Sequence, residues 1–466
     1  MASELSHVAA NVLPVNPIAG RDTPRPIEER LARYNCPGAA ICVIRGGEVA
    51  DAGGFGEAEA GRRMEADTVF AGASISKPIA AVLAMQLVEE GRVGLDQPVN
   101  EVLQAWRVPE NAYTDAVPVT LRHLLSHTAG LTVHGFGDFP GSRGPTPLET
   151  LTGRPPAANP PVVVDKTPGG SVRYSGGGTT AVELMLEELT GERFADLARR
   201  RIFDPLGMRR TTFGQPLPEA FHAITAVGHD ALGRPLPRRF TYTPQLAAGG
   251  VYTSAPDYAR FMVECRRAWL GEDNVLLGRE ATRAMMTRQG SSQFGLGWEL
   301  VGGAAMRFGH GGSNDGYQCN ATCFLESGDG VVVLTNALLG IILHAELLNA
   351  VAAAYGWPDV APPRRIRELP PETQALYVGR YRVVSGVSAP HLDIWTEEGK
   401  LYSRIEGLIF PPREMFLDLE NGRFFGQQTP AETAITMGPD GRARDIVVLG
   451  EGDVEILRAV REDAAT

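Results

Sequence analysis

An apolar helix that follows a turn of small residues is the feature of this sequence that most restricts its fold. The stretch AGASISKPIAAVLAMQLVEEG spans residues 71–91. Pro78 is tolerated only in the first turn of a helix, so the helix is expected to begin near Ser74–Lys77. The run 79–88 is almost wholly apolar, and a helix that is apolar all round is buried. We therefore expect this helix inside a folded core.

The same turn holds a serine and a lysine three residues apart, Ser74 and Lys77. Residues at this spacing share one face of a helix, so the hydroxyl and the amine are expected to be neighbours. A serine hydroxyl needs an adjacent base to act as a nucleophile. Burial and the helix N-terminus both disfavour the ammonium form of Lys77, which makes its amine such a base. An N-cap serine beside a solvated lysine explains the same S-x-x-K pattern, and these residues alone leave both interpretations open.

The length and the charge of the chain limit its domains and its partners. With 466 residues the chain is long for one domain, so two are expected. The net charge is −11, from 44 basic and 55 acidic residues. This balance disfavours nucleic acid and anionic membrane surfaces as partners. The sequence does not fix an oligomeric state.

The cysteines and histidines indicate neither disulfides nor a metal site. The five cysteines are not in C-x-x-C spacing and are expected to be small buried apolar residues. The histidines include no H-E-x-x-H motif. His123 and His127 are four residues apart, but no third ligand is apparent, so we predict no metal and no cofactor.

The first residues of the chain and its apolar runs bear on its location. Residues 1–20 show no basic start followed by an apolar segment, the pattern of a secretory signal. No apolar run reaches the ~20 residues that span a bilayer. If Met1 is the true start, we expect a cytoplasmic protein.

The order of predicted strands and helices is typical of an α+β fold. Short strands are expected at 39–44 and 49–54, and again within 294–336. Helices are predicted mainly between these two groups of strands. This order favours one antiparallel sheet of N- and C-terminal strands, flanked by helices. The segment 131–170, rich in glycine and proline, is expected to be a long loop that contributes to binding.

A proline-rich segment separates a second region from the first. The sequence PDVAPPRRIRELPP, residues 358–371, carries five prolines. Residues 377–460 then show short alternating strands and turns without a helical period, which indicates a small all-β barrel or sandwich. We predict a first domain at 1–357, a linker at 358–372 and an all-β domain at 373–466.

Two further segments carry groups that acyl transfer uses. Tyr174 lies in Y-S-G, before a triple glycine that is expected to leave a loop backbone open. A tyrosine held near a cation can have a lowered pKa and act as general acid or base. In His310–Ser313, the sequence H-G-G-S, the glycines let a backbone N–H face a substrate oxygen. A packing tyrosine and a β-turn are the alternative interpretations.

Taken together and in this order, the three motifs resemble those of the serine β-lactamase and penicillin-binding protein superfamily. The family pattern is S-x-x-K, then Y-x-N or S-x-N, then K-T-G or H-x-G. Here these are Ser74–Lys77, Tyr174–Gly176 and His310–Gly312. The chain is most similar to the class C β-lactamase-type branch, which includes peptidases of the S12 type and family VIII esterases. The resemblance covers roughly residues 26–355, and the terminal β region resembles lipocalin-like modules appended to some members.

The resemblance implies a role for each matched residue. Ser74 is implied to be the nucleophile that accepts the acyl group, and Lys77 its base or proton relay. Tyr174 is implied to assist proton transfer to and from the leaving group. The backbone N–H groups of Ser74 and Ser313 are implied to form the oxyanion hole. His310 is implied to line the pocket opposite Tyr174.

Two departures from the family pattern affect the expected substrate. Gly176 stands where the pattern often has asparagine, so an amide that grips the substrate is absent. His310 stands where β-lactamases have lysine, and a histidine is mostly neutral at pH 7. Both changes weaken recognition of a carboxylated amide. Gly176, His310, Gly312 and Ser313 are still expected to line the substrate site or the oxyanion hole. Acyl transfer itself is unaffected.

Three functions are compatible with these residues. The first is a serine esterase that acts on short-chain or uncharged acyl esters, and it is the function that we predict. The second is a D-amino-acid-specific peptidase, amidase or peptidyl acyltransferase of the same mechanism, with weak or no β-lactamase activity. The third is a sensor that binds without turnover, which the presence of Ser74, Lys77 and Tyr174 disfavours.

Overall fold

The computed structural model describes residues 4–290, 292–302, 305–358, 362–408, 410–450 and 453–462. Contacts divide the chain into two compact units. The first is built on Glu28–His344, and the second on His7–Ile27 together with the chain from Ala345 onward. The boundaries expected from the sequence, at 357 and 372, stay a prediction.

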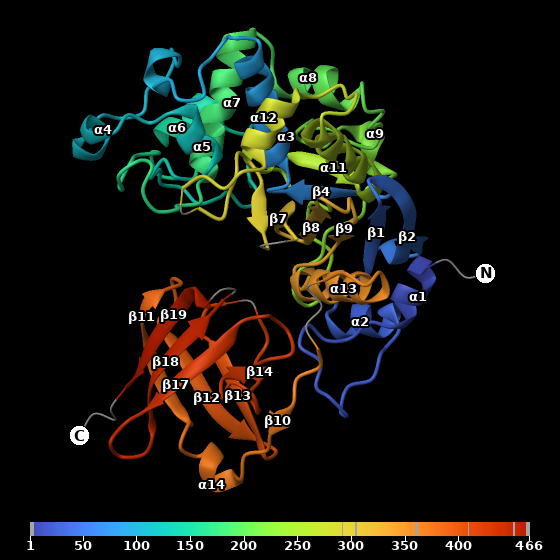
Figure 1. Cartoon of the computed structure of the whole chain (residues 1–466), viewed down its shortest axis with the longest axis vertical. Helices are drawn as coiled ribbons and strands as arrows, with labels where there is room; N and C mark the ends of the chain where they lie inside the picture. Colours follow the sequence, from blue (N-terminus) through green and yellow to red (C-terminus); the bar gives the residue numbers. More distant parts are fainter. Residues whose placement is uncertain are drawn as a thin grey trace. The chain divides into compact units, whose positions relative to one another are not determined.

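The centre of the first unit is a seven-stranded antiparallel sheet with the order β3-β2-β1-β9-β8-β7-β6. Its strands are β1 (Gly38–Arg45), β2 (Glu48–Glu59), β3 (Arg62–Arg63), β6 (Glu299–Val301), β7 (Arg307–Asn314), β8 (Tyr317–Phe324) and β9 (Gly330–Thr335). The N-terminal strand β1 pairs with the C-terminal strand β9, so the two ends of this unit share one sheet (Figure 1). The expected α+β fold is confirmed.

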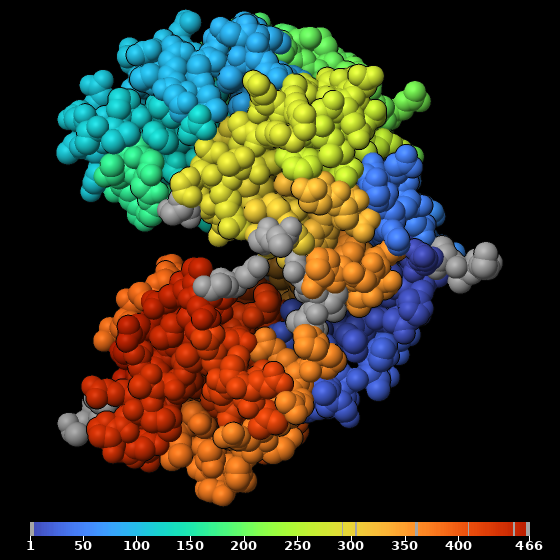
Figure 2. All heavy atoms as spheres, viewed as in Figure 1, coloured from blue at the N-terminus to red at the C-terminus, as the bar shows by residue number. Residues whose placement is uncertain are grey.

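Three longer helices belong to the first unit. They are α3 (Ser76–Glu89), α7 (Gly176–Thr190) and α11 (Ala255–Leu270). Helix α11 contacts β1, β2 and β9, whereas α3 contacts α7. Figure 2 shows segments that are distant in sequence, coloured blue, green and yellow, packed side by side in this unit.

Shorter elements connect the longer ones. They are α1 (Glu4–Ala10), α2 (Ile27–Arg33), η1 (Val99–Glu101), α4 (Ala112–Ala116), α5 (Leu121–Leu125), α6 (Pro147–Thr152), α8 (Phe194–Ala198), η2 (Arg199–Phe203), α9 (Glu219–His222), α10 (Leu246–Gly249), α12 (Arg279–Met285) and the strand pair β4 (Val69–Ala73) and β5 (Val251–Ser254). Helix α13 (Gly340–Ala354) runs across the boundary between the two units.

Helix α3 is as central as its composition predicts. Every residue from Ser76 to Leu87 is buried. Burying one leucine or isoleucine side chain contributes roughly 1.5–3 kcal/mol, so this helix is a large part of the stability of the unit. It begins at Ser76, so Ser74 lies in the turn before the helix and Lys77 in its first turn.

One detail of the sequence prediction is corrected by the structure. The triple glycine after Ser175 was expected to form an open loop, but Gly176–Gly178 are the first turn of α7. Ser175 caps this helix by accepting a hydrogen bond from the Gly178 N–H at 2.8 Å, and this cap overrides the low helix propensity of glycine. The segment 131–170 is mostly irregular, as expected, and contains the short helix α6 with a capping box at Thr146.

The second unit contains a ten-stranded antiparallel sheet with the order β10-β15-β16-β17-β18-β19-β11-β12-β13-β14. Its strands are β10 (Ile366–Arg367), β11 (Gly379–Gly386), β12 (His391–Glu397), β13 (Lys400–Ile405), β14 (Arg413–Glu414), β15 (Phe416–Asp418), β16 (Phe424–Phe425), β17 (Glu432–Met437), β18 (Ala443–Leu449) and β19 (Glu455–Arg461), with helix α14 (Pro371–Gln374). Met415 alone separates β14 from β15, so the sheet curls back on itself.

This curled sheet confirms the expected all-β character of the C-terminal region. Its interior holds a separate apolar cluster that includes Tyr381, Ile394, Phe424 and Ile446. The likeness to lipocalin-like modules stays a prediction. In the part of the chain that the structure describes, no helix has the length and apolarity needed to cross a bilayer.

Candidate active site

Ser74 lies at the tip of a strained turn between β4 and α3. The preceding residue, Ala73, has a φ of 47°, in the left-handed region that side-chain-bearing residues rarely adopt. The Ser76 hydroxyl fixes this conformation: it donates to the Ala73 carbonyl at 2.7 Å and accepts from the Val251 N–H at 3.0 Å. The turn therefore holds Ser74 in one place before any substrate arrives.

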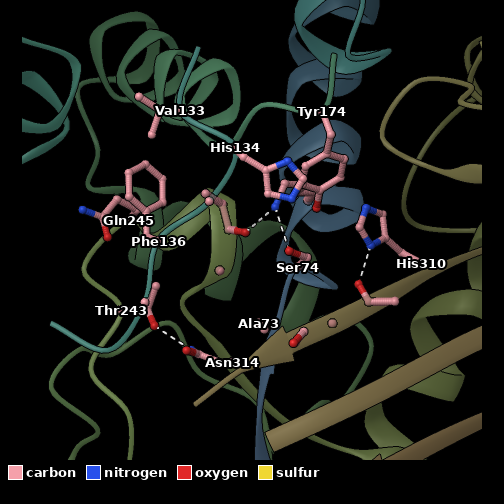
Figure 3. A pocket seen from close by; sticks show the side chains of 18 of the residues that line it. Ala73, Ser74, Val133, His134, Phe136, Tyr174, Thr243, Gln245, His310 and Asn314 are labelled. Atoms are coloured by element: carbon pink, nitrogen blue, oxygen red, sulfur yellow. Dashed lines mark hydrogen bonds between the residues drawn. The ribbon is translucent and has the colours of Figure 1, made fainter. Parts of the chain in front are cut away.

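Lys77 is a buried amine in direct contact with Ser74. Its Nζ lies 2.9 Å from the Ser74 Oγ and 2.6 Å from the Ala248 carbonyl oxygen (Figure 3). Burial lowers the pKa of Lys77 to about 7 because the ammonium loses its hydration. A large share of Lys77 is therefore neutral at pH 7, and the neutral amine can accept the serine proton.

Tyr174 is the third member of this group and lies just before Ser175, the N-cap of α7. Its hydroxyl is hydrogen-bonded to Ser74, and the Lys77 Nζ lies 4.8 Å from its ring centroid. The expectation that a cation lowers its pKa is not met, because burial raises the pKa of Tyr174 and outweighs the hydrogen bond. Tyr174 is thus a neutral phenol that holds its proton.

His310 faces Tyr174 across the site, with 6.1 Å between ring centroids. Its Nδ1 lies 2.6 Å from the Gly311 carbonyl. Burial, and then the charge of Lys77, lower the pKa of His310 to about 3. His310 is therefore neutral at pH 7 and does not replace the permanent cation of a lysine.

His127 and His134 also contact Tyr174, and sequence reasoning did not place them in the site. Their ring centroids lie 4.3 Å and 4.9 Å from that of Tyr174. The His127 Nδ1 accepts a hydrogen bond from the Ser175 N–H at 3.2 Å. Burial lowers the pKa of both histidines. His127 has a φ of 57° just after α5, which turns it away from His123 and toward Tyr174.

Strand β7 approaches the serine turn closely at Gly312. A Cβ atom there would lie 2.2 Å from the Gly72 carbonyl oxygen and 2.4 Å from the Cys319 Sγ, so only glycine fits. Gly312 and the exposed Ser313 line the same cavity as Ser74. The oxyanion hole assigned to the N–H groups of Ser74 and Ser313 stays a prediction.

Gly176 lies outside this group. A Cβ atom on Gly176 would meet the Phe136 ring at 3.1 Å and the His134 carbonyl at 3.2 Å, and its N–H donates to the same carbonyl at 2.9 Å. Gly176 supports the segment 134–136 from behind and is not among the residues that line the cavity. The predicted contact of Gly176 with substrate is therefore not seen.

The cavity above Ser74 measures about 1160 Å³ and is large enough for a substantial acyl substrate. In Figure 3, His134, Tyr174 and His310 surround Ser74, and Phe136, Thr243 and Gln245 lie farther across the cavity. Among its described lining residues, the charged ones are Lys77, Asp138 and Glu299, and none is an arginine. Apart from Lys77, the charge of the wall is negative.

Residues 25–354 match the Beta-lactamase family. The chain belongs to the β-lactamase family. This assignment confirms the resemblance inferred from the three motifs and identifies the chain as a member of a family of serine hydrolases.

Relatives of this β-lactamase family member include proteins with different activities. It is 28% identical to "Penicillin-binding protein 4" of Amycolatopsis lactamdurans over 361 residues, 72% of this chain and 91% of that one. It is 30% identical to "Esterase EstB" of Burkholderia gladioli over 311 residues, 58% of this chain and 76% of that one. The octameric penicillin-binding protein homologue from Pyrococcus abyssi shares its fold, with a TM-score of 0.63, 23% identity and coverage of 93% and 98%.

The cysteines of this family member form no disulfide, and one of them, Cys319, lines the cavity beside Gly312. All five cysteines are free and buried, as the sequence predicted. Among the described residues, no three His, Cys, Asp or Glu side chains form a group that could hold a metal ion. The site therefore offers a serine, an amine and a phenol, the set that acyl transfer needs.

Proposed function

We propose that this protein is a serine hydrolase that forms an acyl-enzyme on Ser74 and hydrolyses uncharged acyl esters. The observation that carries the proposal is the 2.9 Å contact between the Lys77 Nζ and the Ser74 Oγ. The burial that lowers the pKa of Lys77 to about 7 makes that amine a base at neutral pH.

The reaction follows from the protonation states of the three groups. The neutral Lys77 amine takes the Ser74 proton while the Oγ attacks the ester carbonyl, and the N–H groups of Ser74 and Ser313 stabilise the oxyanion. The Tyr174 phenol gives its proton to the departing alkoxide, and the Lys77 ammonium returns a proton to Tyr174. Water then attacks the acyl-enzyme by the reverse sequence of proton transfers and releases the acid.

The charges around the cavity support an uncharged substrate. A substrate carboxylate would meet the Asp138 and Glu299 carboxylates, and the wall, as far as the chain is described, has no arginine and no second lysine. Like charges at close range disfavour a partner by several kcal/mol in buried sites. A neutral ester is free of this repulsion. His310 is neutral at the same pH and adds no attraction for an anion.

A second candidate is an amidase or peptidase acting on substrates with a free α-ammonium group, including D-amino-acid amides. The observation that favours it is Asp138, whose Oδ1 accepts the Tyr242 N–H at 2.6 Å and which lines the cavity. A carboxylate held in this way is a fitting partner for an ammonium group. The chemistry at Ser74 is the same in both candidates.

Intact-protein mass spectrometry tests the shared part of the proposal. The protein is mixed briefly with nitrophenyl acetate or butyrate, and a transient acyl adduct is expected on the wild type. Ser74→Ala should form no adduct and show no turnover, whereas Ser327→Ala, in an exposed hairpin turn, should behave as the wild type. Turnover that survives Ser74→Ala contradicts the proposal.

A substrate panel then separates the two candidates. Nitrophenyl esters of neutral acids are compared with D- and L-aminoacyl esters and amides at equal concentration. A higher kcat/KM for the neutral esters supports the esterase, and a preference for D-aminoacyl amides supports the amidase. A penicillin is included as a carboxylated amide, and a long-lived penicilloyl adduct on Ser74 would contradict the exclusion of carboxylates.

A further inference from the structure

Helix α7 carries a buried carboxyl group, Glu183, that is linked to the proposed catalytic pair Ser74 and Lys77 through the short helix α10. Glu183 is 2% exposed, and within the described part of the chain it has no ion pair. Its Oε2 accepts a hydrogen bond from the Ala247 N–H at 2.9 Å, and the Leu246 N–H also donates to this carboxyl group. Glu183 thus binds the first turn of the short helix α10.

Helix α10 carries the group that holds Lys77. The Ala247 N–H donates a hydrogen bond to Glu183, and the carbonyl oxygen of the following residue, Ala248, lies 2.6 Å from the Lys77 Nζ. Helices α3, α7 and α10 contact one another in pairs. A lysine amine ends a flexible four-carbon stem, so a second acceptor besides Ser74 decides where the amine rests. One path of contacts therefore runs from Glu183 through Ala247 and Ala248 to Lys77.

We propose that Glu183 is a positioning residue that fixes α10, so that the Ala248 carbonyl holds the Lys77 amine within reach of the Ser74 hydroxyl. This inference rests on the proposed function, in which Lys77 is the base for Ser74. Glu183 touches neither substrate nor a reacting atom and acts only through α10.

The protonation state of Glu183 suits this role. Burial raises its pKa to about 8, so the group is mostly a neutral acid at pH 7 with one acceptor oxygen and one O–H donor. A carboxylate at this place would favour the ammonium form of Lys77 and reduce the supply of the neutral base. A carboxamide has nearly the same shape and also offers an acceptor and donors, so Glu183→Gln is the conservative variant.

Helix α7 supplies a matched control. Glu187 lies one turn after Glu183, and its Oε1 accepts the Phe194 N–H at 2.9 Å at the start of α8. The contact has the same chemistry, a glutamate on α7 that binds a backbone N–H, but it leads away from Lys77. Glu187→Leu removes a comparable contact but leaves the hydrogen bonds from α10 to Glu183 in place.

The test measures how fast Ser74 reacts with a fluorophosphonate, a probe that needs no knowledge of the natural substrate. The rate constant per folded molecule and the melting temperature are recorded for wild type, Glu183→Leu, Glu183→Asp, Glu183→Gln and Glu187→Leu. Misplacing a catalytic group by about 1 Å costs on the order of 100-fold in rate. We expect Glu183→Leu to react about 10- to 100-fold more slowly and Glu183→Asp to fall between it and the wild type.

The controls separate positioning from stability. Glu183→Gln should react within about threefold of the wild type, and Glu187→Leu should react at the wild-type rate even if its melting temperature falls. With an ester substrate, the loss in Glu183→Leu should be in kcat, with KM changed little.

Two outcomes overturn the inference in different ways. Wild-type rates in both Glu183→Leu and Glu183→Asp would refute the positioning role and leave the proposed function intact. If Glu183→Leu does not fold, the Glu183→Asp rate decides. A wild type that is inert toward the fluorophosphonate would refute the proposed function at Ser74 and this inference with it.

Discussion

The cavity has two walls that are built in different ways. The catalytic wall, defined by Ser74, Lys77 and Tyr174, stands on buried helices and a strained turn. The loop wall, residues 133–140, consists of backbone without regular structure. Arg238 donates hydrogen bonds to it, to the Phe139 carbonyl at 2.8 Å and to the Pro140 carbonyl.

Because the walls are built differently, we expect the catalytic wall to govern the rate of the reaction and the loop wall to govern the choice of substrate. The catalytic wall is packed so tightly that its distances and protonation states are fixed by the core. The loop wall is held by a few hydrogen bonds, such as those from the Gly176 N–H to the His134 carbonyl and from Arg238 to the Phe139 carbonyl. Substitutions of its exposed side chains therefore change the shape and charge of the cavity without disturbing the core. We therefore expect large rate effects with little change in selectivity from the first wall, and the opposite from the second.

The largest effect is expected from Lys77→Met. The variant removes the proposed base but keeps an unbranched side chain of similar length, so kcat/KM for nitrophenyl butyrate should fall about 10³-fold. The melting temperature should not fall, because a buried amine is replaced by an apolar group. Lys166→Met, at an exposed position, is the matched control. A loss below tenfold in Lys77→Met would mean that another group takes the serine proton.

The next largest effect is expected from Tyr174→Phe. The ring still packs between His127 and His134, so the fold should be unchanged, but the proposed proton donor to the leaving group is lost. We expect kcat for butyrate esters to fall about 100-fold. The loss should be smaller for nitrophenyl esters than for alkyl esters, because nitrophenolate leaves without a proton. Equal losses for both leaving groups would contradict the proton-donor role and favour a packing role.

Whether the sequence predicts a contact in either wall depends on how far apart the two residues lie in the chain. Ser74 and Lys77 are three residues apart in one turn, so a local pattern fixes their contact. Tyr174 and His310 come from distant segments and were predicted only because their motifs resemble a family. His127 and His134 were missed because their approach to Tyr174 depends on a left-handed residue and on tertiary packing.

Two incorrect predictions concern the glycines that follow Ser175. The triple glycine was expected to be a loop because glycine disfavours helices, but the Ser175 cap and the packing of α7 outweigh that preference. Gly176 was expected in the cavity from its place in a motif. Only the contact with the segment 134–136 shows that it supports the loop wall from behind.

A smaller effect is expected from pH, and it tests the catalytic wall alone. The pKa of Lys77 is lowered to about 7, so the active neutral amine forms as the pH rises through 7. Below that value kcat/KM should fall about tenfold for each pH unit. His310 does not account for this limb, because its pKa is lowered to about 3.

The measurement is kcat/KM for a neutral ester between pH 5 and pH 9, where the substrate itself does not titrate. His310→Asn should leave the limb near pH 7 in place even if it changes the rate. A limb that moves or disappears in this variant would assign it to the histidine and not to Lys77. The result would then place the titrating base on β7, opposite the serine turn.

The smallest effect is expected on the loop wall, from Asp138→Asn. Asparagine keeps an oxygen that accepts the Tyr242 N–H, so the loop should retain its shape. The kcat/KM for a neutral ester should stay within about twofold, whereas that for an aminoacyl ester should fall about fivefold, as the loss of a partly exposed ion pair costs up to about 1 kcal/mol. Asp115→Asn, at an exposed position on α4, serves as the control. If both substrates lose activity equally in Asp138→Asn, the loop wall acts on the reaction itself, and the division between the two walls is wrong.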